Sequence, residues 1–532
     1  MRPTSLIAVL ILLALGATTA WAAAPPDPKN SPIGMNLREV RDWSADVPFV
    51  DVFRAARTFR ESNPDLELDE HGWVKSLNGD QTATTYMLWD IKGRFPGGRY
   101  EVTYQGKGRI RYGGGAEPVS RGEGRDVVSI NPAENGLQLE ILATDPADPI
   151  RDIRVIMPGG ICASDPFARV EREGECAKGD YVSFKDNHAT QIFNPDYLKF
   201  LRPFKVLRFM DMMNTNASPL EAWSDRARPT DATWSTPRGV PVEIMVELAN
   251  RMQADAWFTL PHQADDAYVF NFAEYVRDHL KPELKVYVEY SNEVWNGAFE
   301  QNRYALEMGQ KLRLDPDKYT AAQMFYSKRS VEIFKIFEKV FGGDSRLVKV
   351  LASQAANAWF GDLILGYQDA AKHADALAIA PYFGGHMGDP GTADRVERLS
   401  VAGLFDELRT KSLPEAIEWM EANAKVAKKH GVDLIAYEGG HHLAGFHGAE
   451  NRKKLNDLFD DADRHRQMRG MTSRYLDAWR KAGGKLFVYY SSPTKMSKWG
   501  RWGLTDSLYR KREEAPKYDA VLEFIENNPK WW

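Results

Sequence analysis

The fold class follows from residues 286–296, which read Val286-Tyr-Val-Glu-Tyr-Ser-Asn292-Glu293-Val-Trp295-Asn296. A run rich in valine and tyrosine breaks here into a polar loop. Apolar residues with helical spacing lie on both sides of it, at 267–280 and 321–341. A short buried strand between two amphipathic helices is typical of a parallel α/β architecture, in which helices cover the sheet.

The same alternation of strands and helices runs from about residue 194 to the end of the chain. Together with a first strand before residue 40, it predicts eight strands, at 33–37, 206–210, 256–260, 286–290, 347–352, 376–380, 434–437 and 486–490. Eight such strands favour a closed (β/α)8 (TIM) barrel over an open doubly wound sheet. No glycine-rich nucleotide fingerprint leads from any of these strands into a helix, which weakens the open-sheet alternative further.

A different pattern interrupts the barrel between its first and second strands. Residues 61–158 contain short alternating strands separated by glycines, which predicts a β-sandwich inserted into the barrel or packed beside it. The glycine clusters, such as 113–115, open no helix and therefore indicate hairpin turns, not a phosphate-binding loop. The expected division is a first barrel strand and helix at 23–60, the sandwich at 61–158, a linker loop at 159–193 and the remaining barrel at 194–532.

The N-terminus and the two cysteines point to export. Arg2, the apolar run 6–17 and Ala20-Trp21-Ala22 predict a secretory signal peptide over residues 1–22, with an uncleaved anchor as the alternative. Cys162 and Cys176 flank a polar loop and are expected to form a disulfide, although two free thiols remain the alternative. We therefore expect a secreted or periplasmic protein without stable membrane insertion after signal cleavage.

The composition excludes several classes of protein. With 532 residues, 27% of them charged and 43% hydrophobic, the chain is neither disordered nor a polytopic membrane protein. Its 69 basic and 74 acidic residues give a net charge of -5, so no basic surface for nucleic acid is predicted. Two cysteines are too few for a zinc ribbon. The 15 tryptophans and 21 tyrosines are numerous flat amphipathic side chains.

Two glutamates stand where barrel enzymes carry their catalytic groups, at the carboxyl ends of strands. Glu293 follows the fourth predicted strand, and Glu438 follows the seventh in Leu434-Ile-Ala-Tyr437-Glu438-Gly439-Gly440. Two opposed carboxyls are what retaining glycoside hydrolysis requires, because one protonates the leaving oxygen while the other attacks the anomeric carbon. Two structural glutamates in salt bridges at the barrel mouth are the alternative.

With this pair the chain resembles the clan-A glycoside hydrolases, whose signature is Asn-Glu after the fourth barrel strand and a second Glu after the seventh. The resemblance covers residues 194–532 and the first strand. It implies that Glu293 is the general acid/base, that Glu438 is the nucleophile and that Asn292 holds the sugar 2-hydroxyl. No cofactor and no metal ion are expected for this chemistry, and the neighbouring His441 and His442 are read as sugar contacts or loop packing.

Other strand ends match the clan less specifically, and the resemblance implies substrate-binding roles there. Arg208 would bind the nucleophile, with a structural pair to Asp211 as the alternative. His262 would line the sugar site or cap a helix, and Tyr382 would bond the nucleophile. Trp295 would lie beside the acid/base, while Trp499 and Trp502 would form the floor of the −1 subsite. Ala380 departs from the pattern, because several clan members have a histidine there.

The predicted function is a retaining glycosidase that acts on a polysaccharide or oligosaccharide by double displacement. The alternative from another class is a non-catalytic carbohydrate-binding protein on the same barrel, involved in exopolysaccharide handling. The sugar, the linkage and the oligomeric state stay open at this point.

Overall fold

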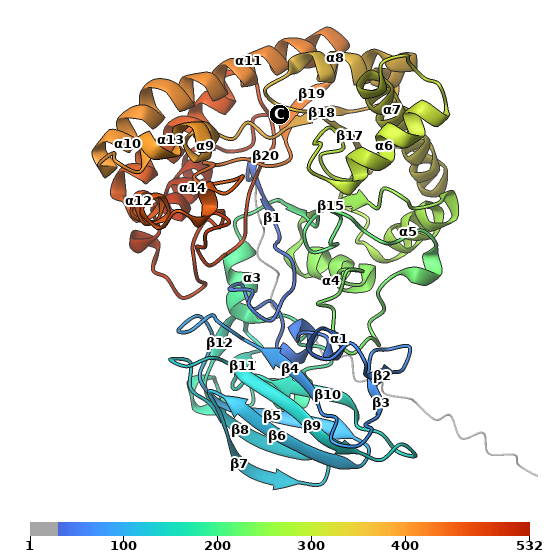
Figure 1. Ribbon diagram of the computed structural model, residues 1–532, viewed down its shortest axis with the longest axis vertical. Coiled ribbons are helices and arrows are strands. Elements are labelled where there is room, and N and C mark those ends of the chain that lie inside the picture. The colour runs from blue at the N-terminus through green and yellow to red at the C-terminus, as the bar shows by residue number, and fades with distance from the viewer. Residues whose placement is uncertain (1–29) are drawn as a thin grey trace, which may run out of the picture.

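The computed structural model of the chain describes residues 30–532, so the predicted signal peptide lies outside the described residues. Its centre is a closed barrel of eight parallel strands in chain order (Figure 1). All eight strands predicted from the sequence are present, as β1 (Ile33–Asn36), β14 (Val206–Arg208), β15 (Asp255–Leu260), β16 (Val286–Tyr290), β17 (Leu347–Ala352), β18 (Ala376–Ile379), β19 (Asp433–Ala436) and β20 (Phe487–Tyr489).

The barrel strands are apolar because both of their faces are buried. Inside the barrel, Trp257 stacks on Tyr287 and packs with Val206, Val350 and Ile435. The helices of the barrel part of the chain are α3 (Pro195–Leu201), α4 (Val242–Met252), α5 (Asp266–His279), α6 (Glu300–Lys311), α7 (Lys318–Phe341), α8 (Ala358–Gly366), α9 (Pro390–Val396), α10 (Val401–Glu407), α11 (Leu413–His430), α12 (Lys453–Arg464), α13 (Arg466–Lys481) and α14 (Pro516–Asn527), and α4, α7, α8 and α11 pack against its strands.

Two larger antiparallel sheets lie between β1 and β14 in the chain and, with a small sheet of β2 (Glu67–Leu68) and β3 (Val74–Ser76), form the lower part of the molecule in Figure 1. Their order is β10-β5-β8-β7 and β4-β9-β6, with strands β4 (Ala83–Met87), β5 (Gly98–Gln105), β6 (Gly108–Gly114), β7 (Ala116–Gly122), β8 (Arg125–Ile130), β9 (Leu137–Thr144) and β10 (Arg151–Ile156). Both sheets contribute to one hydrophobic core, as a β-sandwich does. The edge strand β7 is almost wholly exposed and shows no apolar alternation, so hydrophobic periodicity does not indicate it.

The first βα unit differs from the expected division. Residues 30–60 hold β1 but no barrel helix; only the short turn η1 (Val52–Ala55) and the start of α1 (Phe59–Ser62) lie there. The helix that leads into β14 is α3, after the insert, because the insert splits the unit between its strand and its helix.

The expected linker at 159–193 is not a plain loop. It forms a small antiparallel sheet of β11 (Gly160–Cys162), β12 (Asp165–Val170) and β13 (Tyr181–Ser183), followed by α2 (Phe184–Asn187). The predicted disulfide is present: Cys162 and Cys176 are bonded, with their Cα atoms 5.4 Å apart. Such a bond is usual in proteins of oxidising compartments.

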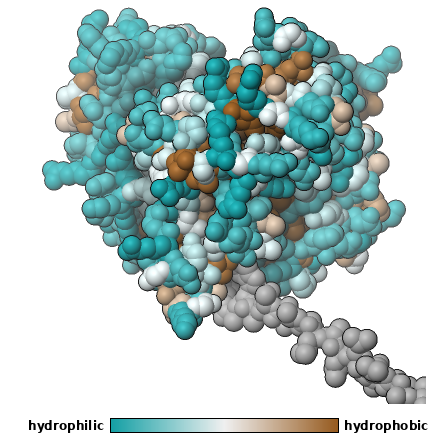
Figure 2. All heavy atoms as spheres, turned by 90° about the horizontal axis from the view of Figure 1, so that it is seen from below, coloured by the Kyte–Doolittle hydropathy of each residue, from teal (hydrophilic) through white to brown (hydrophobic). Residues whose placement is uncertain are grey.

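The surface at the sandwich end is mostly hydrophilic, with only small hydrophobic patches (Figure 2). Within residues 30–532 no helix has the length and apolar character needed to cross a bilayer.

Polar contacts fix the insert against the barrel near the last barrel loop. Arg94 donates to the backbone oxygen of Asp506 at 2.9 Å, and Lys495 donates to the backbone oxygen of Asp90 at 2.8 Å. The insert therefore reaches the carboxyl end of the barrel, where the candidate site lies.

Candidate active site

The two predicted glutamates lie in one cavity at the carboxyl ends of the barrel strands. Glu293 follows β16 and Glu438 follows β19, and both line a cavity of about 430 Å³. Five of the other predicted site residues are close by. Asn292, Trp295, Tyr382 and Trp502 line the same cavity, and Arg208 is buried behind Glu438.

Glu438 accepts two hydrogen bonds that orient it. The Arg208 guanidinium donates to Oε1 at 2.9 Å and the Tyr382 hydroxyl donates to Oε2 at 3.0 Å. The chain can turn closely after this residue because Gly439 follows it. A Cβ at that position would lie only 2.4 Å from the Phe487 ring, so the strand end fits against β20 only with glycine.

Glu293 is held by uncharged donors. Its Oε1 accepts from the Tyr437 hydroxyl at 3.0 Å and its Oε2 from the Asn296 amide at 2.8 Å. Ser291 and Glu293 both have left-handed backbone angles, with φ of 58° and 43°. Non-glycine residues rarely adopt this conformation, and such strain concentrates at functional sites, where the surroundings enforce it.

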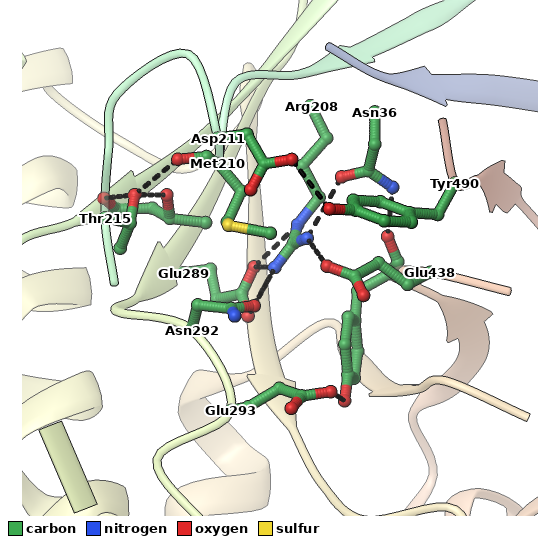
Figure 3. Close-up of polar contacts among 12 residues, drawn as sticks. Asn36, Arg208, Met210, Asp211, Thr215, Glu289, Asn292, Glu293, Glu438 and Tyr490 are labelled. Atoms are coloured by element: carbon green, nitrogen blue, oxygen red, sulfur yellow. Dashed lines mark hydrogen bonds and ion pairs between the residues drawn. The ribbon is translucent and has the colours of Figure 1, made fainter. Parts of the chain in front are cut away.

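Arg208 is the central cation of the site (Figure 3). It is fully buried, and each of its five N–H groups has an acceptor. These acceptors are the carboxylates of Glu289 and Glu438 and the side-chain oxygens of Asn36 and Asn292, at 2.9–3.2 Å. Arg208 therefore fixes residues from three other barrel strands or their ends, β1, β16 and β19.

Glu289 is a site residue that the sequence reasoning missed. It lies on β16, four positions before Glu293, and is completely buried. It pairs with Arg208 through both carboxylate oxygens and also accepts from the Trp257 indole at 2.8 Å. A charged residue inside the apolar run Val286–Tyr290 was the available signal, because a buried charge needs a partner. Arg208 consequently divides its charge between Glu289 and Glu438.

The network around the nucleophile candidate also includes residues at the carboxyl ends of β1, β14 and β20. Asn36, at the end of β1, donates to the backbone oxygen of Tyr437 at 2.8 Å. Asp211 accepts from Arg38 and from the Tyr490 hydroxyl, both at 2.8 Å, and makes no pair with Arg208. These contacts join residues far apart in the chain, so no local sequence pattern indicated them.

Burial raises the pKa of both glutamates. Burial and the charge of Glu293 hold the pKa of Glu438 above its usual range, while Arg208 acts in the opposite direction. Burial also raises the pKa of Glu293, against the hydrogen bonds from Asn296 and Tyr437. Neighbouring carboxyls titrate as a pair. Burial therefore favours the state in which the two carboxyls share a proton.

Two predicted residues lie elsewhere. His262 is buried with its ring edge against Tyr304 and is absent from the cavity lining. Trp499 is 64% exposed and lines a second cavity, next to the first, instead of the cavity that holds the glutamates. Both residues follow their strands as expected, but the loops turn their side chains in other directions.

The structure shows no group of three or more possible metal ligands among residues 30–532. His441 instead pairs with Asp463 at 2.7 Å, and Lys517 binds the same carboxylate at 2.6 Å. His442 lines the cavity, where its ring meets the edge of Trp502. His441 therefore lies in the protein interior, whereas His442 faces the cavity.

No protein-family model matches the chain, and no curated protein matches its sequence. Similar solved structures include the GH51 arabinofuranosidase from Xanthomonas axonopodis pv. citri, with 10% identity, a TM-score of 0.38 and coverage of 64% of this chain and 67% of that one. Another is a Bacteroidetes-affiliated GH5 cellulase linked with a polysaccharide utilization locus. It has 10% identity and a TM-score of 0.37, and the match covers 63% of this chain and 86% of that one.

The β-glycosidase from the hyperthermophile Thermosphaera aggregans gives 13% identity, a TM-score of 0.36 and coverage of 63% and 85%. At such low identities and TM-scores, these likenesses say nothing about the activity of this chain. The chain has a closed barrel of eight parallel strands, and these three similar solved structures are an arabinofuranosidase, a cellulase and a β-glycosidase.

Proposed function

We propose that the protein is a retaining glycoside hydrolase that acts on a polysaccharide or oligosaccharide. The observation that carries the proposal is the unequal surroundings of two carboxyls in one cavity. Glu438 accepts a hydrogen bond from the buried cation Arg208, whereas Glu293 accepts only from the neutral side chains of Tyr437 and Asn296. A cation favours the ionised form of a carboxyl, so the negative charge belongs on Glu438 and the shared proton on Glu293.

This protonation state suits double displacement. Glu438 attacks the anomeric carbon and forms a glycosyl ester while Glu293 gives its proton to the leaving oxygen, which departs as a hydroxyl. Glu293, now ionised, takes a proton from water, and the hydroxide equivalent releases the sugar with its original anomeric configuration. Asn292 accepts from Arg208 at 2.9 Å, which supports the proposal that it bonds the sugar 2-hydroxyl during both steps.

The test is a screen of glycans with the full chain lacking only its predicted signal peptide. We expect release of reducing sugar from at least one neutral polysaccharide, and proton NMR during the first minutes should show that the released anomer keeps the configuration of the bond that was cut. An inverted first product contradicts the mechanism. Binding without release of sugar would instead favour the non-catalytic carbohydrate-binding protein. We also propose that the protein is secreted or periplasmic, which its disulfide supports.

The pH dependence should reveal the role of Glu289. Because Glu289 takes part of the Arg208 charge, its replacement in Glu289→Gln leaves more of that charge for Glu438 and lowers the pKa of the pair. Activity is lost on the acidic side when the nucleophile becomes protonated. The acidic limb of kcat/KM against pH should therefore move to lower pH by roughly one unit.

The matched control for this prediction is Glu338→Gln, which removes a carboxylate that pairs with Lys349 at 2.7 Å, between α7 and β17. It should leave both limbs of the profile unchanged. A Glu289→Gln profile that moves to higher pH, or does not move, shows that Glu289 has no influence on the charge of Glu438.

A further inference from the structure

A second cavity of about 390 Å³ adjoins the one that holds the glutamates. Trp502 lines both, and the wall between them also contains the hydrogen bond from Arg38 of the second cavity to the Tyr490 hydroxyl of the first. The second cavity lies where three segments meet, namely the loop after β1, the insert at Asp90 and the loop after β20. The proposed reaction does not use it.

Two large aromatic side chains are exposed in this second cavity. Trp43 is 42% exposed and Trp499 is 64% exposed. Tryptophan is a residue that proteins mostly bury, and its flat face combined with one polar group makes it a frequent binding residue. Two of them in one hollow therefore indicate a surface that is covered when a ligand binds.

The turn that carries Trp499 is fixed before any ligand binds. Residues 497–500 form a tight turn closed by hydrogen bonds between the backbones of Ser497 and Gly500. The Trp502 indole donates to the backbone oxygen of Trp499 at 3.0 Å and lies against Gly500, where a Cβ would be 2.1 Å from its nitrogen. This turn directs Trp502 to the shared wall and Trp499 to the second cavity. A turn that is already ordered loses little backbone freedom on binding, which favours affinity.

The polar groups of the second cavity balance in charge. Arg38 and Lys495 are its basic lining residues, and Glu39 and Asp90 are its acidic ones. Arg38 already binds Asp211, and Lys495 already binds Asp90, so neither cation is left to select an anionic ligand. Glu39 and the backbone groups can accept or donate hydrogen bonds at the edge of the hollow. This combination fits a neutral polyhydroxylated ligand.

We propose that this cavity is a second glycan-binding site, which holds neutral sugar units of the same chain whose bond is cut between Glu293 and Glu438. The proposal rests on the proposed function. Because the two cavities share Trp502, a chain that leaves the first continues over this ring onto Trp499 and Trp43. The occupant is therefore a distant part of the substrate, and the site should matter for long glycans but not for short ones.

The test compares the wild type with the double variant Trp43→Ala/Trp499→Ala. Affinity electrophoresis is run in gels that contain barley β-glucan, konjac glucomannan or wheat arabinoxylan, with polygalacturonate as the acidic polymer. The wild type should be retarded by at least one neutral polymer and not by polygalacturonate, and the double variant should lose at least tenfold in affinity. Tyr319→Ala is the control, since Tyr319 is 56% exposed but lines neither cavity.

Hydrolysis gives the second readout. The double variant should lose at least tenfold in kcat/KM on the polymer that binds, and less than twofold on an aryl glycoside of the same sugar. Equal losses on both substrates, no loss on either, or no retardation of the wild type by any neutral polymer overturns the proposal. A Glu438→Ala variant that keeps full activity contradicts the proposed function alone, because retardation in the gel does not require catalysis.

Discussion

Replacing Glu438 by alanine should lower kcat by roughly 10,000-fold or more, because the variant has no group that can form the glycosyl ester. Binding should persist, since the other residues that line the cavity remain. The substitution leaves an empty space beside Tyr382 and Arg208, both of which donate to the Glu438 carboxylate in the wild type. A small anion such as azide suits this space, because these two donors face it.

Azide should therefore restore part of the activity of Glu438→Ala, and the product should be a glycosyl azide with inverted configuration, because azide attacks directly in a single step. Product NMR and mass spectrometry with an aryl glycoside measure both points. Glu415→Ala, which removes an exposed carboxylate on α11, should behave as the wild type. Full activity of Glu438→Ala would refute the assignment of the nucleophile.

The replacement Glu293→Gln should have a second large effect, which depends on the leaving group. Loss of a general acid costs about 100- to 10,000-fold when the leaving oxygen needs a proton, as it does in a glycan. A dinitrophenyl leaving group needs no proton, so the first step should survive with such a substrate. Hydrolysis of the glycosyl ester is then slow, because no base activates the attacking water. Both kcat and KM should therefore fall.

Two measurements separate this behaviour from simple damage to the site. Pre-steady-state kinetics with the dinitrophenyl glycoside should show a burst of dinitrophenol, and the basic limb of the pH profile should disappear because that limb reports loss of the Glu293 proton. Asn296→Ala removes a donor to Glu293 at 2.8 Å but keeps the carboxyl, so it should retain both limbs. Equal losses on activated and natural substrates would show that Glu293 is not the acid.

The sequence alone was sufficient for the features that depend on local pattern and chain order. Apolar runs between amphipathic helices predicted all eight barrel strands, since buried parallel strands must be apolar on both faces. Their order placed Glu293 and Glu438 after the fourth and seventh strands, and every strand of a parallel barrel ends at the same rim. The disulfide also followed, because its two cysteines are the only ones in the chain.

Side-chain directions in the loops were decided by tertiary contacts. Asp265 caps α5 by accepting from the Tyr268 amide, and His262 nearby packs against Tyr304 away from the cavity. Trp234, on the loop after β14, is buried against Phe49, which precedes the insert in the chain. The direction of a loop side chain depends on partners that are distant in sequence. Hydrophobic periodicity does not predict these partners.

Local pattern and chain order are therefore enough to predict the barrel and the strand ends that carry the two glutamates. How the charges of these glutamates are set depends on contacts between distant strands. Arg208, Glu289 and Asn36 come from three different strands, one of them separated from the others by the whole insert, and their hydrogen bonds exist only when the barrel closes. The same closure joins Trp43 to Trp499 in one cavity. The physical reason is that burial and pairing, which set the pKa of a carboxyl, are properties of the packed molecule and not of any segment of it.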